Sequence, residues 1–373
     1  MLPAGLRDGL PDEAAHEARV VERLLACFDA CGYQRVKPPL VEFEDTLVRG
    51  SGAAMAGYTF RLMDPVSQRM MGVRADMTLQ VARIATTRLG GAPRPLRLSY
   101  AGEVLRVRAT QLVPERQLVQ VGVEIIGAPP VSADAEAVLL AAEALAGVGM
   151  EGLSVDLTAP TLVPMLCNGL DIEAKAQAGL RDALDHKDAA GVAAAAGEHG
   201  ALFGALLAAA GPAGEALARM EALALPPAAA EEVGRIARVV ALVGAGAPEL
   251  GLTLDPVENR GFEYHTGTSF AVFARGARGE LGRGGRYLAG AGPGEAATGF
   301  TFIIETVLRA LPGPVAGDRL FLPFGTPGEA GRRLREKGWV ALAGLEAAAD
   351  VEAEARRMGC SHVLIGGIPR ALE

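Results

Sequence analysis

Apolar side chains near the start of the chain change from a helical to a strand-like spacing. Over residues 11–32 they recur every three or four positions, which predicts an amphipathic helix. Residues 33–41 predict a strand. The Pro38-Pro39 pair places that strand at a sheet edge or a bend, because proline cannot donate to a ladder. Residues 58–74 predict a hairpin.

Two longer strands are predicted at residues 95–108 and 117–126. The second alternates between apolar and other side chains, which places Gln120, Gly122 and Glu124 on one face. A carboxylate turned into an apolar core is costly unless it is paired. Glu124 therefore either faces solvent or contacts a ligand, and the pattern leaves both open.

Helical spacing predicts helices at residues 75–88 and 134–147. Between residues 161 and 247 alanine dominates and strand patterns vanish, which indicates a helical insertion. Its predicted helices are 174–184, 200–210 and 230–243. His186 and His199 lie in this insertion without metal-ligand companions, so both are expected to be structural or exposed.

Residues 258–287 combine ionisable side chains, glycines and two strand-like runs. One interpretation is a surface hairpin with a flexible tip. The other is a pair of strands that line a small-molecule pocket, with Arg260 and Arg286 directed at anionic groups. Composition alone does not choose between them.

The rest of the sequence, from residue 297 onwards, indicates that the chain divides into two units. Residues 297–310 form a strand that turns into a helix, and a Pro/Gly linker follows at 313–317. Beyond it, strands and helices alternate in a small α/β module. The expected organisation is a core domain at residues 1–312 and a C-terminal domain at 318–373.

Composition narrows the classes of function. The chain has 373 residues, of which 50% are hydrophobic and 21% charged, and its net charge is −8. No basic run offsets this acidity, so nucleic acid is not an expected partner. No signal peptide and no apolar run of membrane-spanning length appear, so a cytoplasmic protein without a membrane partner is expected.

The four cysteines give little support for a metal site. Cys27 and Cys31 are one helical turn apart, and buried thiols are the common outcome there. No histidine or second cysteine pair completes a tetrahedral ligand set, so no metal is expected. The sequence also lacks a P-loop, a GxGxxG after a strand and a GxSxG elbow, and no cofactor is expected.

Several motifs together resemble histidyl-tRNA synthetase, a class II aminoacyl-tRNA synthetase, over about residues 2–311. They are, in order, LPAGLRD, GVRADMT, RLSYAGEVLRVR with the following GVE, RGFEYHTG, GRGGRY and GFTFIIETVL. The resemblance implies an α+β fold with an antiparallel sheet flanked by helices.

The resemblance also implies an amino-acid pocket. Asp76 and Thr78 match the residues that hold the ammonium group, and Arg106 matches the arginine of the second class motif, which contacts the carboxylate and the activated phosphate. The other matched positions are Gln120 and Glu124 (amino and imidazole groups), Arg260 (the histidine-specific arginine), and Tyr264 with His265 (a Tyr-Tyr pair).

Three departures argue against tRNA charging. Thr306 occupies the position of the arginine that holds the ATP γ-phosphate, Arg108 replaces a glutamate, and His265 replaces a tyrosine. Loss of a phosphate-clamping arginine typically costs orders of magnitude in rate. The C-terminal module is also shorter than an anticodon-binding domain.

With these departures, the sequence resembles the ATP phosphoribosyltransferase regulatory subunit family. That resemblance implies a subunit without a reaction of its own, which activates the short-form transferase and confers histidine feedback inhibition on the first step of histidine synthesis. It further implies a homodimer through the core and a hetero-octamer with four copies of each subunit. The alternatives are an adenylate-forming ligase and a ligand-free adaptor.

Overall fold

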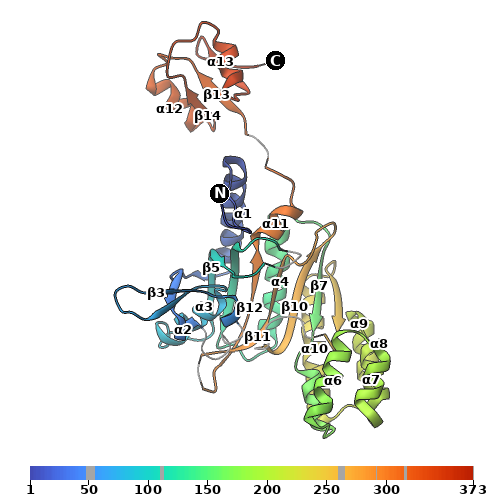
Figure 1. Cartoon of the computed structure of the whole chain (residues 1–373). Coiled ribbons are helices and arrows are strands. Elements are labelled where there is room, and N and C mark those ends of the chain that lie inside the picture. The colour runs from blue at the N-terminus through green and yellow to red at the C-terminus, as the bar shows by residue number, and fades with distance from the viewer. Residues whose placement is uncertain (48–54, 110–112, 259–264, 291, 315–316, 373) are drawn as a thin grey trace. The chain divides into compact units, whose positions relative to one another are not determined.

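The computed structural model describes residues 1–47, 55–109, 113–258, 265–290, 292–314 and 317–372 (Figure 1). The chain divides into two compact units, Met1–Gly313 and Pro314–Glu373. The larger unit carries the residues expected to bind a ligand.

A nine-stranded sheet forms the centre of the larger unit. Neighbouring strands are antiparallel except for the parallel pairs β1/β5 and β7/β9, which confirms the predicted α+β class with an antiparallel sheet. The order across the sheet is β1 (Gln34–Arg35), β5 (Leu96–Leu105), β6 (Gln117–Ile126), β12 (Glu295–Ile303), β11 (Gly282–Ala289), β10 (His265–Ala274), β7 (Leu153–Thr158), β9 (Gly251–Asp255) and β8 (Gly211–Pro212).

The two faces of this sheet carry different helices. Val121, Val123 and Ile125 of β6 pack in the same core as α1 (Pro11–Ala30), α4 (Ser132–Gly147) and α11 (Ile304–Ala310). The alternate positions, Gln120 and Glu124, are buried on the opposite face, where α3 (Thr78–Thr87) packs. Of the two environments left open for Glu124, exposure to solvent is therefore wrong.

In the stretch at residues 258–287, the described strands β10 and β11 do not form a surface hairpin. Strands β10 and β11 lie inside the sheet order, each with a neighbour on both sides. Most of their residues are buried, because the strands carry core on both faces.

The Pro38-Pro39 pair interrupts the predicted strand. Only Gln34–Arg35 joins the large sheet, at its edge, and the chain enters a second sheet after the prolines. That sheet has the order β2 (Val41–Phe43), β4 (Met70–Val73), β3 (Phe60–Met63), and α2 (Glu44–Leu47) follows β2. The β3/β4 pair confirms the predicted hairpin.

The insertion is helical, as predicted, apart from the two-residue β8. Its helices are α5 (Leu162–Gly169), α6 (Ala174–Asp185), α7 (Ala189–Ala196), the 3-10 turn η2 (Gly197–His199), α8 (Gly200–Ala208), α9 (Ala213–Glu221) and α10 (Pro227–Gly246). The expectation that no apolar run reaches membrane-spanning length is wrong, because the run Ala189–Ala208 is long and apolar enough to cross a membrane by length and composition alone. Gly197, with φ of 58°, breaks the run, and α7 packs against α8.

The smaller unit is the α/β module that the alternating pattern predicts, with one further strand. Its sheet order is β14-β13-β15-β16, and β13 is parallel to both of its neighbours. The elements are β13 (Arg319–Leu322), α12 (Gly328–Glu336), β14 (Val340–Ala343), α13 (Val351–Arg357), β15 (His362–Ile365) and β16 (Ile368–Ala371).

Arg286 joins α4 to β11, so the interpretation that directs it at an anionic group of a ligand is wrong. Its Nε donates to Asp134 Oδ2 at 2.9 Å, and its two terminal nitrogens donate to the carbonyls of Ala128 and Pro130 at 2.9 and 3.0 Å. Both charged side chains are buried. All of these donors are directed into the protein rather than towards a ligand.

Arg286→Ala should destabilise the protein by roughly 3–5 kcal/mol, because it leaves the Asp134 carboxylate buried without its partner. Arg219→Ala, which removes an exposed ion pair with Glu215, should cost less than about 1 kcal/mol. Urea unfolding of both variants measures the difference. Equal losses would contradict a structural role for Arg286.

Candidate ligand pocket

Most of the residues expected to bind a ligand line one cavity of about 230 Å³ in the larger unit. Those brought together are Asp76, Thr78, Arg106, Gln120, Glu124 and His265. The other two, Arg260 and Tyr264, lie outside the described residues. The cavity therefore gathers side chains from positions that are almost 200 residues apart in the chain.

The Glu124 carboxylate forms the buried acidic floor of the cavity. Tyr100 Oη donates to Glu124 Oε1 at 3.1 Å, and Tyr287 Oη donates to Oε2 at 2.9 Å. The Tyr100 hydroxyl also lies 2.5 Å from the Thr301 hydroxyl and 3.3 Å from that of Thr78. Burial raises the pKa of Glu124 to about 8, since no cationic side chain among the described residues pairs with it.

Asp76 and Gln120 hold each other at the start of α3. Gln120 Nε2 donates to Asp76 Oδ2 at 2.8 Å, while the Met77 backbone N–H donates to Gln120 Oε1 at 2.9 Å. The Thr78 backbone N–H donates to Asp76 Oδ1 at 2.8 Å. This side-chain turn explains why α3 begins at Thr78 instead of residue 75. A second carboxylate is thus fixed at the cavity wall.

The cationic part of the wall consists of Arg106 and Arg283. Burial lowers the pKa of Arg106, whose Nε donates to the Ala75 carbonyl at 3.4 Å. Arg283 Nε donates to Glu280 Oε1 at 2.8 Å, and both residues line the cavity. Burial, and next the charge of Arg283, lower the pKa of His265 to about 4, so its ring is neutral at pH 7.

Two glycines leave room for these side chains. A Cβ on Gly122 would lie 2.6 Å from the Tyr100 hydroxyl, directly across the β5/β6 pair. A Cβ on Gly285 would lie 2.8 Å from His265 Cδ2 and 2.7 Å from Ser269 Cβ. Larger residues at these positions would displace the polar groups of the floor and wall.

Two of the departures from the synthetase pattern occupy different places. Thr306 lines the cavity, and its hydroxyl donates to the Ile303 carbonyl at 2.7 Å, within the first turn of α11. Its side chain is thus short, and its hydroxyl is already hydrogen-bonded to the backbone. Arg108 is exposed and does not line the cavity. The change at Thr306 therefore alters the pocket itself.

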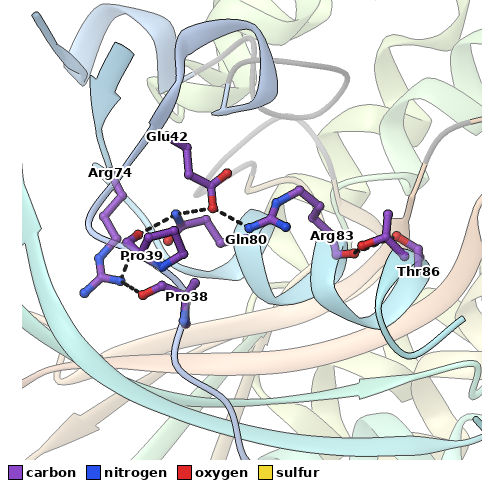
Figure 2. A network of polar contacts seen from close by, with 8 residues as sticks. Pro38, Pro39, Glu42, Arg74, Gln80, Arg83 and Thr86 are labelled. Carbon is purple, nitrogen blue, oxygen red and sulfur yellow. Dashed lines mark hydrogen bonds and ion pairs between the residues drawn. The ribbon is translucent and has the colours of Figure 1, made fainter. Parts of the chain in front are cut away.

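A network beside the pocket holds the turn that carries Asp76 (Figure 2). The buried Arg74 donates to the Pro38 carbonyl at 3.0 Å. Gln80 Nε2 donates to Glu42 Oε1 at 2.9 Å, and Arg83 forms an ion pair with the same carboxylate. Figure 2 shows these contacts linking β2 and α3. The loop between β1 and β2 is thus fastened to the start of α3.

Sequence reasoning missed four residues that line the pocket, Glu280, Arg283, Tyr287 and Thr301, and Tyr100, which supports its floor. Tyr287 and Arg283 lie within the GRGGRY motif, but the pattern did not show which side chains face the cavity. Tyr100 donates to Glu124, Thr301 contacts the Tyr100 hydroxyl, and Glu280 pairs with Arg283. Gly122, between Gln120 and Glu124, was the one signal in the sequence that could have indicated a large side chain opposite it on the neighbouring strand, which is Tyr100.

Comparison with known proteins identifies the class. The family model of histidyl-tRNA synthetase matches residues 5–307. The crystal structure of histidyl-tRNA synthetase from Nostoc sp. PCC 7120 aligns with a TM-score of 0.83 at 16% identity, covering 98% of this chain and 91% of its own. An ATP phosphoribosyltransferase regulatory subunit/histidyl-tRNA synthetase from Bacillus halodurans C aligns with a TM-score of 0.82 at 22% identity, covering 95% and 96%. The chain has the histidyl-tRNA synthetase-like fold.

Sequence relatives identify the family within that class. The ATP phosphoribosyltransferase regulatory subunit of Rhodospirillum centenum is 60% identical over 98% of this chain and 95% of its own length. That of Gluconobacter oxydans is 44% identical over 100% of this chain and 97% of its own. The chain belongs to the ATP phosphoribosyltransferase regulatory subunit family, which confirms the resemblance seen in the sequence.

Glu124→Gln should change how stability depends on pH. Burial raises the pKa of Glu124 from its ordinary value of 4.5 to about 8. Protonated Glu124 therefore stabilises the folded state below pH 4.5, and this contribution falls as pH rises to about 8, by roughly 1.4 kcal/mol per unit at most. The free energy of unfolding of the wild type, minus that of the variant, should fall between pH 5 and 8.5. A constant difference in urea unfolding would contradict this.

Proposed function

We propose that this chain is a regulatory subunit without a reaction of its own, which activates a short-form ATP phosphoribosyltransferase and makes it sensitive to histidine. The observation that carries the proposal is the mixed character of the cavity. Carboxylates suited to an amino acid's cationic groups are retained, while the phosphate-holding position is Thr306. Relatives that bear the name of this regulatory subunit support the same conclusion.

In the proposed complex, histidine occupies the cavity. Asp76 and Thr78 hold the ammonium group and Arg106 the carboxylate, while Gln120 and Glu124 contact the amino and imidazole groups. Arg260, Tyr264 and His265 complete the side-chain pocket, by analogy with the synthetase pattern. The cavity volume of about 230 Å³ suits one small ligand of this kind.

Regulation follows if histidine binds one arrangement of the complex better than another, since a ligand shifts an equilibrium only through its differential affinity. A coupling free energy of about 1–3 kcal/mol gives roughly 5–150-fold inhibition. We propose a cytoplasmic hetero-octamer with four catalytic and four regulatory subunits. Its regulatory subunits pair through their synthetase-like cores, with no nucleic acid and no membrane involved.

The direct test is formation of phosphoribosyl-ATP by the purified short-form transferase from the same organism, with and without this chain, across a histidine titration. We expect strong activation that histidine reverses. Absence of activation, with the two proteins eluting separately, would refute the proposal. Histidine-dependent pyrophosphate exchange by this chain alone would then favour the adenylate-forming ligase.

Variants should separate activation from feedback. Glu124→Gln and Arg260→Met should weaken inhibition by histidine by about tenfold or more while the transferase remains activated, because each variant loses a polar contact to the ligand. Glu232→Gln is a matched control, since Glu232 is also a buried glutamate but lies in α10, outside the cavity. If both pocket variants remain fully sensitive to histidine, the effector binds elsewhere. If the two variants no longer bind histidine but histidine still inhibits the transferase, this cavity is not the sensor.

Histidine binding should release protons between pH 6.5 and 8. With its pKa near 8, Glu124 is largely protonated before the ligand binds, and a cationic group placed beside it lowers that pKa. Calorimetric titration in buffers of different ionisation enthalpy measures the proton count. Proton release that persists unchanged in Glu124→Gln would contradict this assignment.

A further inference from the structure

A cluster of thiols and a carboxylate lies on the sheet face opposite the pocket, between α1 and α4. The ligand atoms of Cys27, Cys31 and Glu143 all lie within 4.8 Å of one another. Cys27 lies in the last turn of α1, Cys31 is the C-cap residue of that helix, and Glu143 comes from α4. The sequence showed only the cysteine pair, since the third group is more than 100 residues away.

The helices hold these groups in fixed positions. The Cys31 backbone N–H donates to the Cys27 carbonyl at 3.2 Å, so the pair keeps its helical spacing. The next residue is Gly32, with φ of 83°, and the Tyr33 N–H donates back to the Phe28 carbonyl at 3.0 Å. This pattern ends the helix with a defined turn. The cysteine side chains are thus anchored rather than placed on a loose loop.

Contacts along both helices set the distance to Glu143. Arg23 of α1 donates to the Gly147 carbonyl at the end of α4. Tyr33, just after α1, donates to Glu136 of α4 at 2.8 Å. These contacts bracket the cluster on either side, which places Glu143 opposite the cysteine pair.

Among the nearby carboxylates, Glu143 is the one available for a ligand. Glu136 accepts two hydrogen bonds from Arg97, at 2.7 and 2.8 Å, besides the bond from Tyr33. In the described part of the chain, Glu143 has neither a hydrogen bond nor an ion pair. A cavity of about 300 Å³ borders both Cys31 and Glu143, which leaves room for an ion and its water ligands.

The environment does not favour a reactive thiol. Burial, and next the negative charge of Glu143, raise the pKa of the Cys27 thiol to about 11, and burial also raises that of Cys31. Thiols of this kind are poor nucleophiles at neutral pH, because the thiolate is the reactive form. A divalent cation reverses this balance, since a coordinated thiol loses its proton.

We propose that Cys27, Cys31 and Glu143 form a binding site for one thiophilic divalent metal ion of the zinc type, with water from the adjacent cavity as the fourth ligand. Two sulfur ligands and one carboxylate are a donor set that zinc accepts in tetrahedral geometry. On binding, the two thiols each release a proton to the buffer. The ion would join the end of α1 to α4, the helix whose Asp134 is paired with Arg286.

The test is zinc binding to the full-length, reduced and chelator-treated protein, measured by competition with a chromophoric chelator. We expect one equivalent per chain. Cys31→Ser and Glu143→Gln should each weaken binding at least about tenfold, since even outer-sphere partners of a metal contribute about 10–100-fold. Zinc should also raise the melting temperature of the wild type, because the ion binds the folded state. Both altered residues are exposed, so the variants are expected to fold.

Two controls make the result decisive. Cys360→Ser removes a thiol from the smaller unit, and Glu151→Gln removes an exposed carboxylate outside the cluster. Both should bind zinc as the wild type does. Cobalt(II) substitution should give tetrahedral and sulfur charge-transfer absorption that Cys31→Ser diminishes. The proposal fails if the wild type binds no zinc, or if Glu143→Gln or Cys31→Ser binds it as tightly as the controls.

Discussion

The buried carboxylate of Glu124 is the constraint on which the rest of the pocket depends. Its two oxygens accept hydrogen bonds from Tyr100 of β5 and Tyr287 of β11. These two strands flank the β6/β12 pair in the sheet. Two hydroxyl donors only partly offset the cost of burying a negative charge. The pKa of Glu124 is raised because part of that desolvation cost is not offset. A cationic ligand group at this position would supply what the described side chains do not.

Another buried carboxylate, Asp134 of α4, shows the contrast. Asp134 Oδ2 is paired with Arg286, whose donors are all directed at protein acceptors, although burial still raises the pKa of Asp134. That pair fastens α4 to β11 and contributes structure. Glu124 lies on the other face of the sheet without such a partner among the described residues. Two acids of similar burial therefore have different roles, and the presence or absence of a guanidinium distinguishes them.

The same cavity explains how one fold serves a class of synthetases and a regulatory family. In the proposed function, Arg106 and the acidic residues provide contacts for an amino acid, whereas the Thr306 hydroxyl donates to the Ile303 carbonyl. A short neutral side chain at that position cannot offer a bidentate contact to phosphate. Binding without activation is the property that a sensor of the amino acid requires, and the proposed function depends on this separation.

The sequence alone predicted the positions of most long helices and strands, because periodicity is a local property of the chain. Its motifs, through their resemblance to histidyl-tRNA synthetase, predicted the fold class and six residues that line one cavity. Alternation along β6 placed Gln120 and Glu124 on one face, but only the tertiary structure decided that this face was buried. It also decided that Arg286 meets Asp134 and that Glu143 meets the cysteine pair. These contacts join residues more than 100 positions apart, and their geometry depends on how α4 packs on the sheet.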